Sequence, residues 1–245
     1  MMQFTDCPDD QIEARLPGRQ RAIIRRIDAS LRFDQPAYAV NWFNTRSRWL
    51  YELYNFLAAG SVKAIGGAPF FKGRLIKRLH GVDNDSRSLI LVVRYPALEQ
   101  FKVMLENKYF QLLSSLRLLA VKDFTFGFMK RRAWDTPLEP VSKTVDRDEV
   151  YLVHHFRGDP SIADDLIACG RDLEIETVFA GTIGAIVSTG SSKSDLATTP
   201  CLMDAIVIFR GPNEASTEAL SQSGGYQSAI LKSASSFVGT YRRIM

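Results

Sequence analysis

The sequence is poor in the side chains that build metal centres and disulfide frameworks. It has three cysteines and three histidines among 245 residues, and Cys7, Cys169 and Cys201 lie far apart, without the paired spacing of a metal site. An odd number of scattered cysteines is typical of reduced thiols in the cytosol. We therefore expect no disulfide, no metal ion, no cofactor and a cytoplasmic location.

Long apolar runs and a strong charge of one sign are also missing. No stretch of about 18 apolar residues occurs, and the N-terminus does not show a basic region followed by an apolar one, so we expect no membrane span and no targeting segment. The net charge is only +4. The basic run Lys130, Arg131 and Arg132 is not part of a nucleic-acid-binding motif. Nucleic acid is therefore not an expected partner.

The composition is that of a globular protein with a substantial core. Hydrophobic residues make up 46% of the chain, and its length allows two small domains. In residues 1–35, apolar positions at helical spacing predict an N-terminal helical extension, interrupted at Pro17 and Gly18. Residues 134–148 contain two prolines and alternating charges, and they are interpreted as a linker.

The two segments beside this linker, residues 36–133 and 149–245, share one predicted order of strand, helix, strand, strand, helix and strand. Apolar periodicity predicts one helix over residues 98–119 and one strand over residues 201–210. Such a recurring order indicates a tandem duplication. Four positions align at one constant separation: Tyr38 with Tyr151, Val40 with Val153, Asn41 with His154, and Phe43 with Phe156.

The sequence YAVNWF at residues 38–43, with VRYP at 93–96 and NKYFQ at 107–111, resembles a family of small, largely uncharacterised bacterial proteins. This family belongs to the dimeric α+β barrel superfamily, which is ferredoxin-like in fold. The resemblance is weaker in the second segment, where Gly211 and His154 depart from the motif. It implies an α+β protein in which two tandem ferredoxin-like βαββαβ repeats pack their antiparallel sheets as an internal dimeric α+β barrel. Any homodimer would form through the N-terminal helix or the outer strands.

The superfamily includes cofactor-free monooxygenases, heme-degrading enzymes, isomerases and heme proteins similar to chlorite dismutase, so the fold alone does not fix a function. The resemblance favours a small-molecule-binding protein or a metal-free enzyme, monooxygenase-like or isomerase-like, with an apolar pocket beside the sheets. Its ligand would be aromatic or carboxylate-bearing. Two alternatives stay open: a non-catalytic module for oligomerisation or partner binding, and a heme-binding protein with His154 or His155 as axial ligand.

Two ionisable residues in the second segment are candidates for proton transfer. His154 lies in the predicted strand that begins at residue 149, and histidine transfers protons near neutral pH. Asp204 lies in the middle of the predicted strand 201–210, where a buried carboxylate could have a raised pKa. The alternatives are a hydrogen-bonded core histidine and an aspartate paired with a basic neighbour.

Four further residues are candidates for binding a substrate. Arg94 and Arg210 end equivalent predicted strands, where a guanidinium could hold a carboxylate or phosphate. Asn41 matches His154 in the alignment and could orient a substrate, and Trp42 belongs to an aromatic series that could line an apolar cavity. The alternatives are arginines paired with acidic neighbours and aromatic side chains packed in the core.

Overall fold

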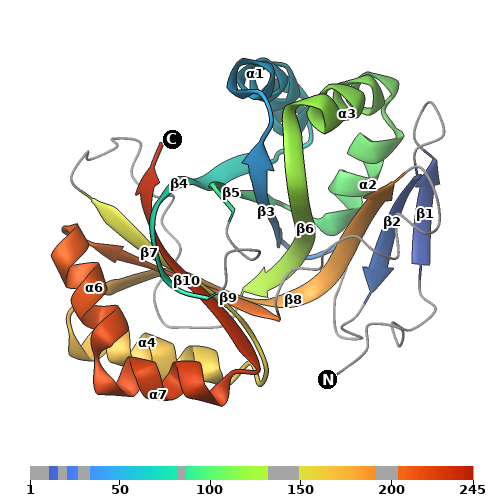
Figure 1. Ribbon diagram of the computed structural model, residues 1–245. Coiled ribbons are helices and arrows are strands. Elements are labelled where there is room, and N and C mark those ends of the chain that lie inside the picture. The colour runs from blue at the N-terminus through green and yellow to red at the C-terminus, as the bar shows by residue number, and fades with distance from the viewer. Residues whose placement is uncertain are drawn as a thin grey trace. The chain divides into compact units, whose positions relative to one another are not determined.

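The computed structural model describes residues 11–15, 21–26, 34–81, 87–131, 149–190 and 204–244 (Figure 1). The chain forms two compact units, each assembled from separate segments. Unit 1 contains residues 1–69, 92–130 and 183–202, and unit 2 contains residues 70–91, 131–182 and 203–245.

Unit 1 contains a sheet with the strand order β1-β2-β8-β6-β3-β5, to which β5 and β8 contribute their C-terminal parts. Strands β3 and β6 pair antiparallel, with Tyr38 opposite Met129. The alternating apolar side chains of these strands build an aromatic core, in which the rings of Phe101 and Phe128 are 4.8 Å apart. The strands of this sheet are β1 (Gln11–Arg15), β2 (Arg21–Arg26), β3 (Ala37–Thr45), β5 (Leu89–Tyr95), β6 (Val121–Arg131) and β8 (Glu176–Gly190).

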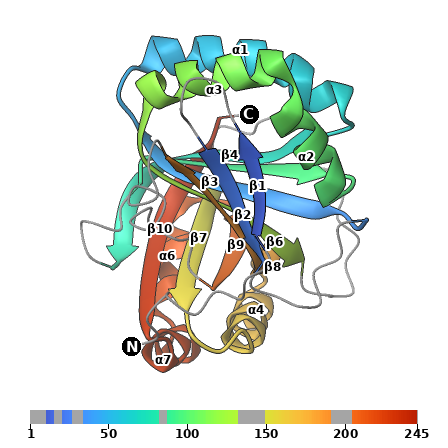
Figure 2. The same cartoon turned by 90° about the vertical axis from the view of Figure 1, so that its right-hand side faces the viewer.

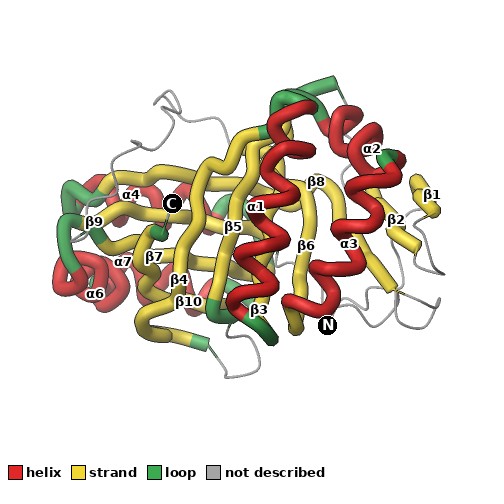
Figure 3. Tube along the Cα trace, turned by 90° about the horizontal axis from the view of Figure 1, so that it is seen from above, coloured by secondary structure: helices red, strands yellow, loops and turns green. Residues whose placement is uncertain are grey.

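Three helices belong to unit 1: α1 (Arg48–Ala64), α2 (Leu98–Glu106) and α3 (Lys108–Ala120). Helices α1 and α3 lie side by side on one face of the sheet (Figures 2 and 3). The helix predicted over residues 98–119 is divided at Asn107, whose side chain accepts hydrogen bonds from the backbone of Tyr109 and Phe110. This capping starts a new helix and rotates the buried face of α3 relative to that of α2.

Unit 2 contains a sheet with the strand order β5-β4-β10-β7-β9-β8. Its further strands are β4 (Ala68–His80), β7 (Val150–Arg157), β9 (Ala205–Gly211) and β10 (Ser235–Arg243). Helices α4 (Ile162–Asp172), α6 (Glu214–Gln222) and α7 (Gly224–Lys232) cover one face of this sheet (Figure 1). Leu152 and Phe156 of β7 pack with Leu166 and Tyr226 in the core between sheet and helices.

The predicted α+β class and the predicted element order are found in both halves of the chain. The first half runs β3, α1, β4, β5, α2 with α3, β6, and the second runs β7, α4, β8, β9, α6 with α7, β10. Strands β5 and β8 belong to both units. When they are included, the hydrogen-bonded strands form the order β8-β6-β3-β5-β4-β10-β7-β9, and β9 pairs with β8 again. This is the neighbour order of an eight-stranded barrel.

The N-terminal helical extension predicted for residues 1–35 is wrong where the structure describes it. Gln11–Arg15 and Arg21–Arg26 form an antiparallel strand pair, and β2 continues onto β8 with Arg26 opposite Ala185. Pro17 and Gly18 divide the apolar pattern into pieces too short for a stable helix. The edge of β8 provides backbone partners for β2 instead, and β2 provides them for β1. Residues 134–148, the predicted linker, lie outside the described residues.

The packing of α4 on β9 yields a stability prediction. A Cβ atom on Gly170 would lie 2.7 Å from the buried ring of Phe209 and 3.2 Å from the backbone oxygen of Ile175. We expect Gly170→Ala to lower the free energy of unfolding by about 1–3 kcal/mol in denaturant titrations, because the ring cannot move away. Gly224→Ala is the control, since nothing lies within 4 Å of its Cβ position. Equal effects of the two substitutions would contradict this packing.

Candidate functional site

His154 is completely buried and is hydrogen-bonded through both ring nitrogens. Its Nε2 lies 2.8 Å from the Ser236 hydroxyl of β10, and its Nδ1 lies 3.0 Å from the Tyr226 hydroxyl of α7. Strand register places His154 directly between Val238 and Val207. The histidine therefore joins three elements of unit 2.

A neighbouring serine determines the direction of these hydrogen bonds. Ser233 donates to the Ile230 carbonyl at 2.7 Å, so its oxygen must accept at 2.8 Å from Ser236. Ser236 then accepts from Nε2–H of His154, and Nδ1 accepts from the hydroxyl of Tyr226. The network thus assigns the neutral Nε2–H tautomer to His154.

Burial keeps this imidazole neutral. Removal from water lowers the pKa of His154 from its usual 6.5 to about 3, and the neighbouring His155 adds to the effect. The role of axial heme ligand does not fit His154, because both ring nitrogens are bonded to protein side chains. Proton transfer by His154 stays a prediction, and it would require one of these bonds to break.

His155 lies on the opposite face of β7 and is also completely buried. Its strand partners are Ile206 and Phe237, and burial lowers the pKa of His155 to about 3. Neighbouring strand residues point to opposite faces, so His154 and His155 cannot act on one ligand from the same side.

The sequence predicted Asp204 in the middle of a strand, and this prediction is wrong. Strand β9 begins at Ala205, and the half-buried Asp204 carboxylate accepts a hydrogen bond of 3.0 Å from the backbone N–H of Gly158. Gly158 has a φ of 137°, a conformation that favours glycine, in the turn after β7. The carboxylate therefore stabilises a turn in this structure.

Arg210 is paired with two carboxylates. Its guanidinium lies 3.6 Å from Glu149 and forms a second ion pair with Glu176. Asp204 and Arg210 stand at opposite ends of β9, about 20 Å apart at the usual rise of a strand. His154 pairs with Val207 midway between them. The structure therefore does not bring the three predicted residues into one site.

The predicted residues of the first half are also separate. Arg94 is exposed near the end of β5, whereas Trp42 is buried in β3. Asn41 is half-buried, and its amide donates to the carbonyl of Ala39 at 3.4 Å. Their substrate-binding roles stay predictions.

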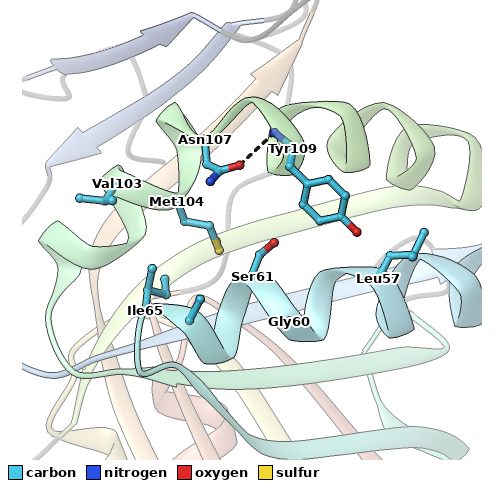
Figure 4. A pocket seen from close by; sticks show the side chains of 9 residues that line it. Leu57, Gly60, Ser61, Ile65, Val103, Met104, Asn107 and Tyr109 are labelled. Carbon is cyan, nitrogen blue, oxygen red and sulfur yellow. Dashed lines mark hydrogen bonds between the residues drawn. The ribbon is translucent and has the colours of Figure 1, made fainter.

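A hollow that the sequence reasoning missed lies in the helix layer of unit 1 (Figure 4). It has a volume of about 340 Å³ between α1 and the junction of α2 with α3. The small residues Gly60, Ser61 and Ala64 leave room on the α1 side, and this stripe is the signal in the sequence that could have revealed it. The other walls are formed by Leu57, Ile65, Val103, Met104, Asn107 and Tyr109.

The polar groups of the hollow suit binding of a neutral molecule. Ser61 and Tyr109 supply hydroxyls, and the amide oxygen of Asn107 is used in capping α3 at 2.9 Å, which leaves its NH₂ group as a donor. None of the lining residues is charged. The arrangement can orient a ligand by hydrogen bonds, but it does not contain an acid or base.

Two features are absent from the described part of the chain. No cluster of three or more His, Cys, Asp or Glu residues there could hold a metal ion. No helix among the described residues is long and apolar enough to cross a membrane.

Comparisons with known proteins show a likeness of fold. No family model matches the chain, and no curated protein matches its sequence. A provisionally named monooxygenase from Fusobacterium nucleatum superposes with a TM-score of 0.51 at 8% identity, over 87% of this chain and 94% of that one. An anthrone oxidase-like protein superposes with a TM-score of 0.49 at 10% identity, over 91% of this chain and 94% of that one. A Rhodopseudomonas palustris protein of unknown function superposes with a TM-score of 0.38 at 20% identity, over 44% of this chain and 85% of that one.

The first of these superpositions covers most of both chains, and it supports the predicted α+β barrel fold. At this identity the likeness concerns the fold and not the chemistry.

The neutral buried histidines generate a pH prediction. Because the pKa of each is about 3 in the folded state and near 6.5 when exposed, the unfolded state binds more protons between these values. The contribution of these two histidines to the free energy of unfolding is therefore fully present above about pH 6.5. It falls toward pH 3, by up to about 1.4 kcal/mol per pH unit for each histidine.

Denaturant titrations from about pH 7 to pH 4 should show this slope, and His154→Gln should make it shallower. The control is His80→Gln, because His80 is exposed and lowers the pKa of His154 less than burial does, so this variant should keep most of the slope. A slope that is the same in all three proteins would show that His154 is not held neutral.

Proposed function

We propose that the protein binds a small, mainly apolar molecule in the hollow between α1 and the α2–α3 junction. The observation that carries this proposal is a volume of about 340 Å³ with apolar walls and a few hydrogen-bonding groups. Ligand sites usually have volumes of about 300–1,000 Å³ and this kind of lining.

The lining supports a ligand with one or two polar atoms on an apolar body. The side chain of Tyr109 extends over the hollow from α3, and Ser61 faces the hollow from α1 (Figure 4). Their hydroxyls and the amide of Asn107 could hold such atoms, and Met104 offers a flexible contact to a ring or chain. The named activity of the Fusobacterium protein is consistent with a small-molecule ligand on this fold.

We also infer that the two halves are tandem copies of one ferredoxin-like repeat, residues 36–133 and 149–245. Their strands have equivalent neighbour orders, β6-β3-β5-β4 and β10-β7-β9-β8. In both copies the second helix is divided by a capping residue, Asn107 in one and Ser223 in the other. These shared details support duplication.

Filling the hollow tests the proposed site. Gly60 has nothing within 4 Å of its Cβ position, so Gly60→Leu should place a side chain in the hollow without strain. We expect this variant to bind a neutral naphthalene-type fluorophore at least ~10-fold more weakly than the parent protein, measured by fluorescence titration. Native mass spectrometry of both proteins would show whether a co-purified molecule is lost as well.

Gly224→Leu is the matched control, because Gly224 is equally open and lies in unit 2. Unchanged affinity in Gly60→Leu, or the same loss in both variants, would remove the hollow as the site.

Self-association is the second candidate function, favoured by the outer face of the same helices. Of eleven large apolar side chains that are exposed among the described residues, eight lie on α1, α2 and α3. Contiguous exposed apolar surface is typical of interaction sites. The eight are Trp49, Leu53, Phe56, Val103, Tyr109, Leu112, Leu118 and Leu119.

A charge placed on this face should separate the copies. Phe56 is 80% exposed and Leu112 is 68% exposed, so the double substitution Phe56→Glu with Leu112→Glu should leave the fold intact. We expect the variant to be monomeric by light scattering at a concentration where the parent protein is a dimer. Leu231→Glu, on the exposed surface of α7, is the control. A monomeric parent protein would exclude this candidate.

A further inference from the structure

Arg117 lies in the centre of the buried face of α3. The side chains at helical spacing around it, Phe110, Leu113, Ser114 and Ala120, are all buried. Arg117 lies about one turn before the end of α3 at Ala120. A cation on the inward stripe of a helix needs a physical reason, because burial of an unpaired charge is costly.

The contacts of Arg117 do not neutralise it. Its guanidinium stacks on the ring of Phe124, 4.4 Å from the ring centre. Its Nε is buried without a hydrogen-bond partner, and no ion pair to Arg117 is found in the described part of the chain. Burial lowers the pKa of Arg117, against a smaller opposing effect of Tyr54. Arg210, by contrast, is held between two glutamates.

Tyr54 on α1 lies near the guanidinium but does not neutralise it. Burial raises the pKa of Tyr54, so its phenol stays neutral beside the guanidinium and cannot serve as a counterion. We call Arg117, Tyr54 and Phe124 the Arg117 cluster. It combines a cation, a neutral phenol and an aromatic ring, with no carboxylate among its members.

We propose that the Arg117 cluster is an oxyanion-binding site in unit 1, which takes a carboxylate or a phosphate group. A guanidinium presents two parallel N–H groups to such an anion, and the stacking on Phe124 fixes its plane. Arg117 is half-buried, so part of its side chain is exposed to solvent. An oxyanion would supply a negative charge and an acceptor for the Nε–H group, which the described residues do not provide there.

This site is distinct from the hollow. Tyr109 lines the hollow at the start of α3, and Arg117 lies eight residues later, about 12 Å along the helix axis. A molecule that engaged both would carry its anionic group about that far from its apolar part. The anion site does not depend on such a molecule, since small anions can bind it alone.

The test uses octanoate and inorganic phosphate as separate probes, with chloride at equal ionic strength as the salt control. We expect at least one of the two oxyanions to raise the melting temperature of the parent protein and to shift the NMR resonance of the Arg117 Nε–H group. Octanoate alone would indicate a carboxylate site, and phosphate alone a phosphate site.

The variant Arg117→Met should lose this response. Without added anion it should be as stable as the parent protein or more stable, because an apolar side chain of similar length replaces an unpaired buried charge. Arg48→Met is the matched control, since Arg48 is exposed at the start of α1, and it should keep the response.

A chloride-like response to both oxyanions in the parent protein would overturn the proposal. So would an equal oxyanion response in Arg117→Met and Arg48→Met. The Nε–H resonance is measured on the parent protein, so a variant that fails to fold does not prevent the decision. The neutral fluorophore reports on the hollow separately, and either site can fail without the other.

Discussion

Strand β7 is hydrogen-bonded to β10 along one edge and to β9 along the other, and all residues from Val150 to Phe156 are buried. Polar side chains in such a strand must find their partners inside the protein. His154 meets this requirement with Tyr226 and Ser236. A slip of one residue in the register would turn His154 away from both, so the histidine also specifies how β7 pairs.

The helix layer of unit 1 has a different distribution of polarity. Arg117 is directed inward with a buried unpaired Nε, whereas Phe56 and Leu112 are exposed. In unit 2 the buried polar groups around His154 form a continuous chain of donors and acceptors. The unpaired nitrogen of Arg117 therefore lies in unit 1, whereas His154, Asp204 and Arg210, which the sequence pointed to, lie in unit 2.

Local patterns predicted most of the fold, because strand alternation and helix periodicity act within short segments. The single helix over residues 98–119 was wrong for a local reason, since the capping by Asn107 restarts the helix. With that restart the inward stripe runs through Phe110, Leu113 and Arg117, and Leu112 is exposed. The prediction of one continuous helix did not single out Arg117.

The predicted site depended on contacts that sequence spacing cannot supply. The partners of Arg210 come from Glu149 and Glu176, and the partner of Asp204 is a backbone group beyond β7. Each is brought close only by pairing of distant strands. The hollow had a local signal in Gly60, Ser61 and Ala64, but small residues on a helix also occur where no ligand binds.

Among the described strands, β2 is hydrogen-bonded to β1 and β8, and β8 reaches Gly190. On the ribosome β2 emerges before β8, so its docking edge is made only after the residues between Arg26 and Glu176 have been synthesised. Pairing between such distant segments is slow, because a long loop must close before the contact stabilises it. Strand β2 thus stays unpaired on this edge, and exposed to chaperones and proteases, until β8 has been made.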